Sequence, residues 1–274
     1  MSRLTLRVVV AAAFVSTVPA FLTSAAAQAQ QPTWSPPAPS ERCPSKWGAA
    51  DERGSMNHMK PAAVLTATKL IRTGEVFELG HVLNGSMPFS GTRRFDLHTK
   101  RTFMNPQSNQ RGSNEETVIS EIGQVGTQFD MLQTGYEITI EDLQAALKRQ
   151  GTALRPGDAV LIHGGWGKLW GKDNARYQTG GHAGIGVRAA EWLIKQDPLL
   201  LGADNGTVEI SPNPDKLISL PVHQLALVVN GVHLLENLKL DELAAKKVYE
   251  FAFIMQPLKM QGGTGSTVAP VAVR

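Results

Sequence analysis

The sequence predicts a single α/β domain with a mixed, partly parallel sheet flanked by helices. Short apolar segments with strand character alternate with helical patterns through the second half of the chain. Strands that alternate with helices favour a sheet in which neighbouring strands run parallel. The chain of 274 residues is also long enough to bury a full hydrophobic core.

Local patterns place the elements along the chain. Helices are predicted at 61–71, 140–150, 187–196, 222–229 and 241–248, and strands at 76–82, 118–122, 159–162, 199–203, 232–235 and 249–255. Thr139 and Asp142 form a capping-box pattern at the start of the second helix, and Gly151 is its expected stop. Residues 86–114 are polar and contain Gly, Arg and Lys, which predicts a long surface loop.

Residues 1–29 have the order of a secretory signal peptide. Two arginines precede an apolar stretch, and small residues follow, so that cleavage after Ala27 or after Ala29 would fit. The apolar stretch is interrupted and too short to span a bilayer. We therefore expect a periplasmic or secreted protein that has no membrane anchor after cleavage. Residues 30–46 are expected to form a Pro-rich linker and residues 47–274 the folded domain.

The charge of the mature protein excludes some classes of partner. The sequence pI is 9.0, but two of the 27 basic side chains lie in the signal peptide, and the others nearly balance the 24 acidic ones. We therefore expect no nucleic-acid partner and no attraction to anionic lipid. Cys43 is the single cysteine and cannot form an intramolecular disulfide.

Three segments gather side chains that a fold alone does not require. Gln124, Gln128 and Asp130 would share one face if residues 123–130 continue as a strand. His223 and Glu236 each lie at the edge of an apolar element. Two carboxylates and an imidazole form a plausible site for a divalent metal ion, Zn²⁺ or Mn²⁺.

The order of these segments resembles the cyclase family of metal-dependent hydrolases, which includes bacterial kynurenine formamidase. The family signature His-x-Gly-Thr-His-x-Asp keeps its skeleton here in residues 124–130, and the later histidine and glutamate of the family match His223 and Glu236. Residues 156–166, 184–186 and 240–243 add weaker matches. The resemblance implies a swivelling β/β/α fold, a divalent metal ion, a small-molecule substrate and a homo-oligomer.

The chain departs from the family pattern at several positions. Gln124 and Gln128 replace the signature histidines, and Thr134 stands where the family has a proton-transfer histidine. A segment that is longer in the family is reduced here to the eight residues between Asp130 and Thr139. An amide oxygen is a poorer zinc ligand than an imidazole nitrogen, so both glutamines are either metal ligands or buried amides.

Two functions follow from the resemblance. The first is an exported metal-dependent hydrolase of a small amide, formamide, ester or lactone, similar to the arylformamidase of tryptophan catabolism to kynurenine. The alternative is a catalytically silent relative that binds a small molecule. Asp130, His223 and Glu236 would otherwise be helix caps or ion-pair partners. Of the other histidines, His233 is expected to be structural, and His182 either to line a pocket or to face solvent.

Overall fold

The computed structural model describes residues 31–42, 45–89, 91–104, 112–122, 125–126, 136–179 and 181–274. The chain divides into two units, Met1–Gln31 and Pro32–Arg274. The predicted signal peptide and Cys43 lie outside the described residues, so both remain predictions. All helices and strands reported below belong to the second unit.

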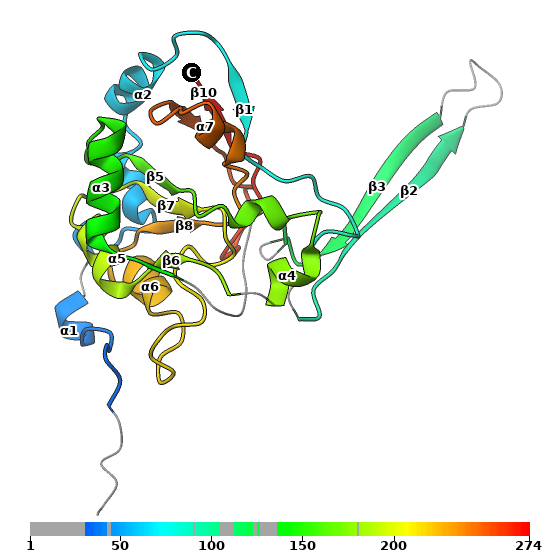
Figure 1. Ribbon diagram of the computed structural model, residues 1–274. Helices are drawn as coiled ribbons and strands as arrows, with labels where there is room; N and C mark the ends of the chain where they lie inside the picture. The colour runs from blue at the N-terminus through cyan, green and yellow to red at the C-terminus, as the bar shows by residue number, and fades with distance from the viewer. Residues whose placement is uncertain are drawn as a thin grey trace, which may run out of the picture. The chain divides into compact units, whose positions relative to one another are not determined.

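A parallel sheet of three strands lies at the centre of this unit (Figure 1). Strand β7 (Leu200–Ala203) pairs on one side with β5 (Ala159–Ile162) and on the other with β8 (His233–Leu235), and both pairs are parallel. The carboxyl ends of the three strands therefore meet at one edge of the sheet. The predicted partly parallel sheet is confirmed.

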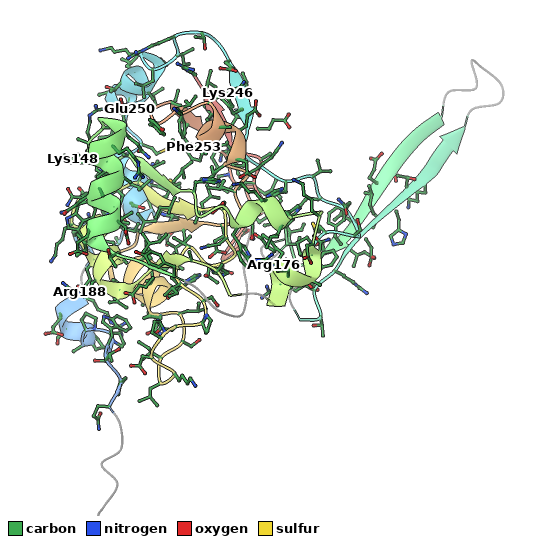
Figure 2. The ribbon with its side chains drawn as sticks, in the orientation of Figure 1. Lys148, Arg176, Arg188, Lys246, Glu250 and Phe253 are labelled. Atoms are coloured by element: carbon green, nitrogen blue, oxygen red, sulfur yellow. The ribbon has the colours of Figure 1, made fainter. Side chains whose placement is uncertain are left out.

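Helices cover one face of this sheet (Figure 1). Helix α3 (Ile140–Gln150) begins with the predicted capping box of Thr139 and Asp142 and ends at Gly151, which has a left-handed backbone. Helix α5 (Val187–Ile194) buries Ala189, Ala190 and Leu193. Figure 2 shows Lys148 of α3 and Arg188 of α5 on the outer side, where both are exposed.

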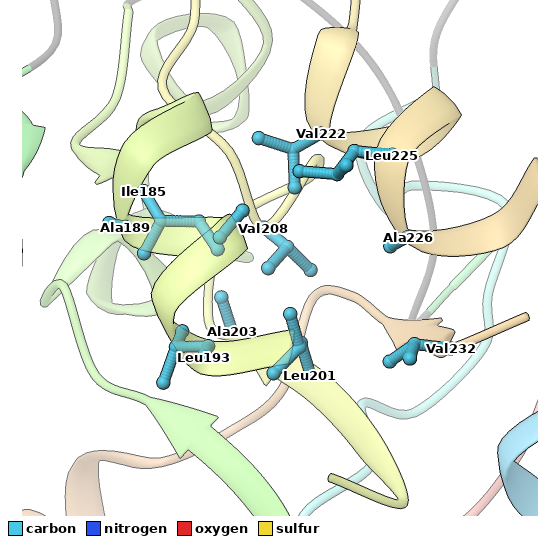
Figure 3. Close-up of a cluster of buried hydrophobic side chains, with 11 residues drawn as sticks. Ile185, Ala189, Leu193, Leu201, Ala203, Val208, Val222, Leu225, Ala226 and Val232 are labelled. Carbon is cyan, nitrogen blue, oxygen red and sulfur yellow. The ribbon is translucent and has the colours of Figure 1, made fainter. Parts of the chain in front are cut away.

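The first core cluster fills the space between the helices and the sheet (Figure 3). Leu201 and Ala203 of β7 point to this side. They pack with residues of α5 and of the segment that follows Pro221. The buried members are Ile185, Ala189, Ala190, Leu193, Leu201, Ala203, Val208, Val222, Leu225, Ala226 and Val232.

An antiparallel sheet lies on the opposite face. Strand β10 (Val271–Val273) pairs with β1 (Val76–Glu78) and with β9 (Ala252–Ile254). Leu200 of β7 packs here with Phe77, Leu79 and Ala272 in a second core cluster. Helices, parallel sheet and antiparallel sheet form three layers, as the β/β/α prediction requires.

The prediction of a surface loop at residues 86–114 is wrong in part, because this range contains a long strand. Strand β2 (Phe95–Met104) pairs with β3 (Gly112–Ser120) as an antiparallel hairpin that leads away from the three layers (Figure 1). Leu97 faces Val118 across the hairpin, and these side chains are 54% and 43% exposed. A ribbon with two exposed faces has no alternation of buried and polar residues, so the sequence pattern does not indicate a strand.

The remaining elements are short. They are α1 (Pro39–Arg42), η1 (Gly54–His58), α2 (Pro61–Thr68), β4 (Glu137–Ile138), η3 (Trp166–Leu169), α4 (Asn174–Thr179), β6 (Gly184–Ile185), α6 (Pro221–His223), the π-helix η4 (Gln224–Val229) and α7 (Asp241–Ala245). The predicted helix 222–229 is thus two different helical segments. Helix α7 ends earlier than predicted, shortly before Lys247 takes a left-handed backbone with φ of 54°. Within the described residues, no helix has the length and apolar character needed to cross a bilayer.

Gly184 of β6 tests how closely these layers are packed. A Cβ atom on Gly184 would lie 2.2 Å from the carbonyl carbon of Glu209. We predict that Gly184→Ala lowers the free energy of unfolding by about 1–3 kcal/mol, because the backbone must move to admit the methyl group. Urea unfolding followed by circular dichroism measures this loss.

Gly85→Ala is the matched control. Its Cβ would meet only the Phe95 carbonyl oxygen, at the ordinary contact distance of 3.5 Å. Equal unfolding free energies for the two variants would show that the close approach of β6 to Glu209 is not present in solution.

Candidate functional site

Two of the predicted metal ligands, His223 and Glu236, lie together. The Nε2 atom of His223 is 3.1 Å from Oε1 of Glu236, although the two residues lie on different elements. Gln124, Gln128 and Asp130 are outside the described residues, as is Thr134. Their roles therefore remain predictions, and the described part of the site rests on the other two residues.

The fold brings these two side chains together from neighbouring segments. Glu236 directly follows the last residue of β8, at the edge where the parallel strands end. His223 is the last residue of α6, and the π-helix η4 begins immediately after it. A π-helix is rare and often accompanies a functional residue.

A third residue, Glu209, contacts His223 from the other side of its ring. Oε1 of Glu209 lies 2.7 Å from Nδ1 of His223. The same carboxylate accepts hydrogen bonds from the backbone N–H groups of Val222, at 3.1 Å, and of His223, at 3.0 Å. Glu209 is fully buried. The imidazole of His223 is therefore held between two carboxylates.

Sequence reasoning missed Glu209, although a signal was present. The residue lies between Val208 and Ile210, in a segment that follows the central strand β7. A carboxylate with an apolar residue on each side and no nearby basic residue in sequence indicates a buried charge that requires a specific partner.

The two carboxylates determine the charge of His223. Burial acts to lower the pKa of His223, but the contacts with Glu209 and Glu236 outweigh it and raise the pKa to about 9. Burial raises the pKa of Glu236, and the nearby imidazole opposes that rise. Two buried carboxylates so close together require a positive charge between them, which either an imidazolium proton or a metal ion can supply.

Unusual backbone conformations surround all three residues. Val208 precedes Glu209 and has a φ of 60°, Leu220 lies just before α6 with a φ of 48°, and Asn237 follows Glu236 with a φ of 53°. A left-handed backbone at a residue other than glycine costs about 1–3 kcal/mol and persists only where surrounding contacts impose it. Figure 3 shows Val208 and Val222, neighbours of Glu209 and His223, packed within the first core cluster.

A buried tyrosine supports the segment that carries Glu236. The hydroxyl of Tyr177 donates a hydrogen bond to Oδ1 of Asn237. Burial raises the pKa of Tyr177 well above its usual value, so the hydroxyl remains a donor. Trp166 and Trp170 pack around Tyr177, with ring centroids 6.3 and 5.2 Å from it. Trp166 and Trp170 therefore pack against the tyrosine that supports this segment.

His223 and Glu236 line a cavity of about 450 Å³. This volume is within the range of small-molecule sites in proteins. One wall comes from the segment between β9 and β10, and includes Pro257, Leu258 and Met260. The other lining residues are Met56, Leu200, Leu227, His233, Leu234, Leu235, Met255, Gly263, Thr264, Gly265, Ser266 and Val268.

The structure places two of the remaining histidines, His233 and His182. His233, expected to be structural, has this role through Nδ1, which lies 2.9 Å from the Ser55 hydroxyl, but it also lines the cavity. His182 does not face solvent, because its side chain is buried and its Nε2 atom is 3.4 Å from the hydroxyl of Thr207. Burial lowers the pKa of His182 to about 4.

The described residues fit part of a metal site. Among them, no three His, Cys, Asp or Glu side chains come together as a set that could hold an ion. His223 and Glu236 nevertheless fit one ion, because two ligand atoms about 2.1 Å from it and roughly at right angles would be about 3 Å apart. Oε1 of Glu236 is buried and has no hydrogen-bond donor with good geometry within the described part of the chain.

Comparison with known families confirms the predicted resemblance. The family model named Cyclase matches residues 108–210 of this chain. The matched range contains the signature segment 124–130 and Glu209, and it ends before His223. A comparison with curated proteins finds no significant match.

Solved structures confirm the predicted fold class. A crystal structure described as a novel cyclase has a TM-score of 0.71 and 24% sequence identity, over 84% of this chain and 98% of that chain. Isatin hydrolase A from Ralstonia solanacearum has a TM-score of 0.53 and 18% identity, over 78% and 95%. Isatin hydrolase A from Labrenzia aggregata has a TM-score of 0.52 and 17% identity, over 80% and 98%.

We predict that His182 makes the fold less stable as the pH falls. Its pKa of about 4 in the folded state lies below the ordinary value of 6.5. The unfolded chain therefore takes up a proton first, and the free energy of unfolding falls by up to about 1.4 kcal/mol per pH unit between pH 6.5 and 4. Urea unfolding between pH 7 and 4.5 should show a steeper fall in the wild type than in His182→Asn.

His98, which is exposed on the hairpin, provides the control. His98→Asn should keep the steep fall of the wild type. A His182→Asn variant with the same pH dependence as the wild type would contradict the assignment.

Proposed function

We propose that this chain, which has the fold and the family resemblance of a cyclase, is an exported metal-dependent hydrolase of a small amide, formamide, ester or lactone. The single observation that carries the proposal is the placement of His223 Nε2 and Glu236 Oε1, 3.1 Å apart, on the wall of a cavity of about 450 Å³. Support for export comes from the order of residues 1–29, which is that of a signal peptide.

His223 and Glu236 would hold a divalent ion, Zn²⁺ or Mn²⁺, and Asp130 is proposed as a further ligand. The sequence also offers the amide oxygens of Gln124 and Gln128. Such an ion supplies Lewis acidity at the bond to be broken. The nitrogen and oxygen donors of the two described residues suit either metal.

The cavity would hold the substrate for hydrolysis. In hydrolysis, the oxygen of water bonds to the carbonyl carbon, the C–N or C–O bond breaks, and the leaving group takes up a proton. Leu235, Met255 and Leu258 supply apolar surface against which the body of a small substrate can pack. Only the carbonyl end of the substrate needs to reach the polar pair His223 and Glu236.

The names of two similar structures bear on the substrate. Both are isatin hydrolases, and isatin is a cyclic amide fused to an aromatic ring. An arylformamide such as N-formylkynurenine combines the same two features, a C–N bond next to a carbonyl and a nearby aromatic ring. The cavity is large enough for either compound. We propose aryl amides and formamides as the substrates to test first.

His223→Asn and Glu236→Gln should each weaken metal binding. Replacing a direct ligand is expected to lower the affinity for Mn²⁺ or Zn²⁺ by more than about 100-fold, since the loss of an outer hydrogen-bond partner alone typically costs about 10–100-fold. Isothermal titration calorimetry of the mature protein with each metal chloride measures this. Glu250→Gln is the control, because Glu250 pairs with Arg155 at the surface and should bind metal like the wild type.

Hydrolysis should depend on the ion. We expect mature protein to hydrolyse N-formylkynurenine, isatin or a lactone, to lose this activity in EDTA and to regain it with added Mn²⁺ or Zn²⁺. Absorbance assays with each compound, combined with metal analysis of the purified protein, provide the measurement. A protein that neither binds metal nor hydrolyses any compound would instead be the silent small-molecule-binding relative.

A further inference from the structure

Glu209 lies against the side of His223 that points away from Glu236. One oxygen of its carboxylate is 2.7 Å from Nδ1 of the imidazole, whereas Nε2 on the opposite side of the ring is 3.1 Å from Glu236. Glu209 is not among the residues that line the cavity. It therefore reaches the cavity only through the ring of His223.

The hydrogen bonds of Glu209 fix Nδ1 of His223 as a proton donor. Backbone N–H groups of Val222 and His223 point at the two oxygens of this carboxylate, so both oxygens act as acceptors. We assign a proton to Nδ1 on this pattern, and Nδ1 donates to Oε1 of Glu209. An ion that binds His223 therefore does so at Nε2, the nitrogen nearest Glu236, where it replaces the second proton of the imidazolium.

The backbone around Glu209 is built to keep the carboxylate in this place. Val208, a β-branched residue, has a left-handed φ of 60°, and its N–H donates to Oδ1 of Asn205 at 2.6 Å. On the other side, the backbone of Gly184 approaches so closely that a Cβ atom would overlap Glu209. Burial of a carboxylate is costly unless its contacts compensate for lost water. The fold therefore maintains both a strained neighbour and a buried charge at this position.

We propose that Glu209 is a positioning residue for His223. It fixes the orientation and the protonated nitrogen of the imidazole, so that Nε2 is presented to an ion beside Glu236. Carboxylates that accept the other N–H of a metal-binding histidine have this effect, and losing one typically weakens metal binding about 10–100-fold. The proposal rests on the metal-dependent function proposed above.

A purely structural role for Glu209 is the competing explanation. In that role the carboxylate only accepts the two backbone N–H groups at the start of α6. Asp204 provides a matched control for this role, because it is also buried and accepts backbone N–H groups from Gly164, Gly165 and Gly167. Asp204 has no described contact with His223. Loss of either carboxylate should destabilise the fold. Only loss of Glu209 should change the orientation and the protonated nitrogen of the His223 imidazole.

The experiment compares the mature wild type with Glu209→Gln and Asp204→Asn. Titration calorimetry with Mn²⁺ and with Zn²⁺ alone should show a 10- to 100-fold loss of affinity in Glu209→Gln and a change of less than about threefold in Asp204→Asn. Glu209→Asp keeps the charge on a shorter side chain and should bind with intermediate affinity. Circular dichroism checks that each variant is folded, and Glu209→Asp replaces Glu209→Gln if the latter does not fold.

A second measurement needs no metal. In protein with ¹⁵N-labelled histidine, the Nδ1–H proton of His223 should appear far downfield, because it is bonded to a carboxylate, and should be lost or shifted in Glu209→Gln. His223→Asn assigns the signal. Unchanged metal affinity and an unchanged signal in Glu209→Gln would overturn the positioning role. If the wild type binds no ion but shows the signal, the metal-dependent function fails while the contact between Glu209 and His223 stands.

Discussion

The position of one imidazole between two buried carboxylates determines how three segments of this chain must meet. Glu209 follows the central strand β7, Glu236 follows β8, and His223 ends a helical turn between them. Each segment includes a residue other than glycine with a left-handed backbone. Val208 packs within the first core cluster, and Asn237 accepts a hydrogen bond from the buried hydroxyl of Tyr177. The segments that carry the charged side chains therefore also contribute to the apolar core.

Much of the fold follows from local sequence patterns. The capping box at Thr139 and the apolar strand 159–162 are where the sequence predicts them, because their signals are local and their side chains are capped or partly buried. The hairpin of β2 and β3 was predicted only at its end, as a strand at 118–122, since the described side chains on both its faces are mostly exposed and give no apolar side. The switch from α6 to a π-helix at His223 depends on tertiary contacts that no local pattern contains.

The candidate site was predictable to a similar extent. His223 and Glu236 stand out as polar residues at the edges of apolar elements, and the structure brings them together. Glu209 was missed because its neighbours in sequence predict core packing, and its partner lies 14 residues away in the chain. That Nδ1 of His223 donates to Glu209 depends on three contacts that converge in space, and the sequence alone does not reveal it.

The wall of the cavity formed by Leu258, Met260 and Ser266 contributes no residue to either core cluster. Leu258 and Met260 are 54% and 41% exposed, so exchanging them removes little buried surface. The shape of this cavity wall can therefore change in evolution with little loss in the free energy of unfolding. Substitutions in this one loop can therefore change which small molecules the cavity admits, while the polar pair and the layers behind it stay the same.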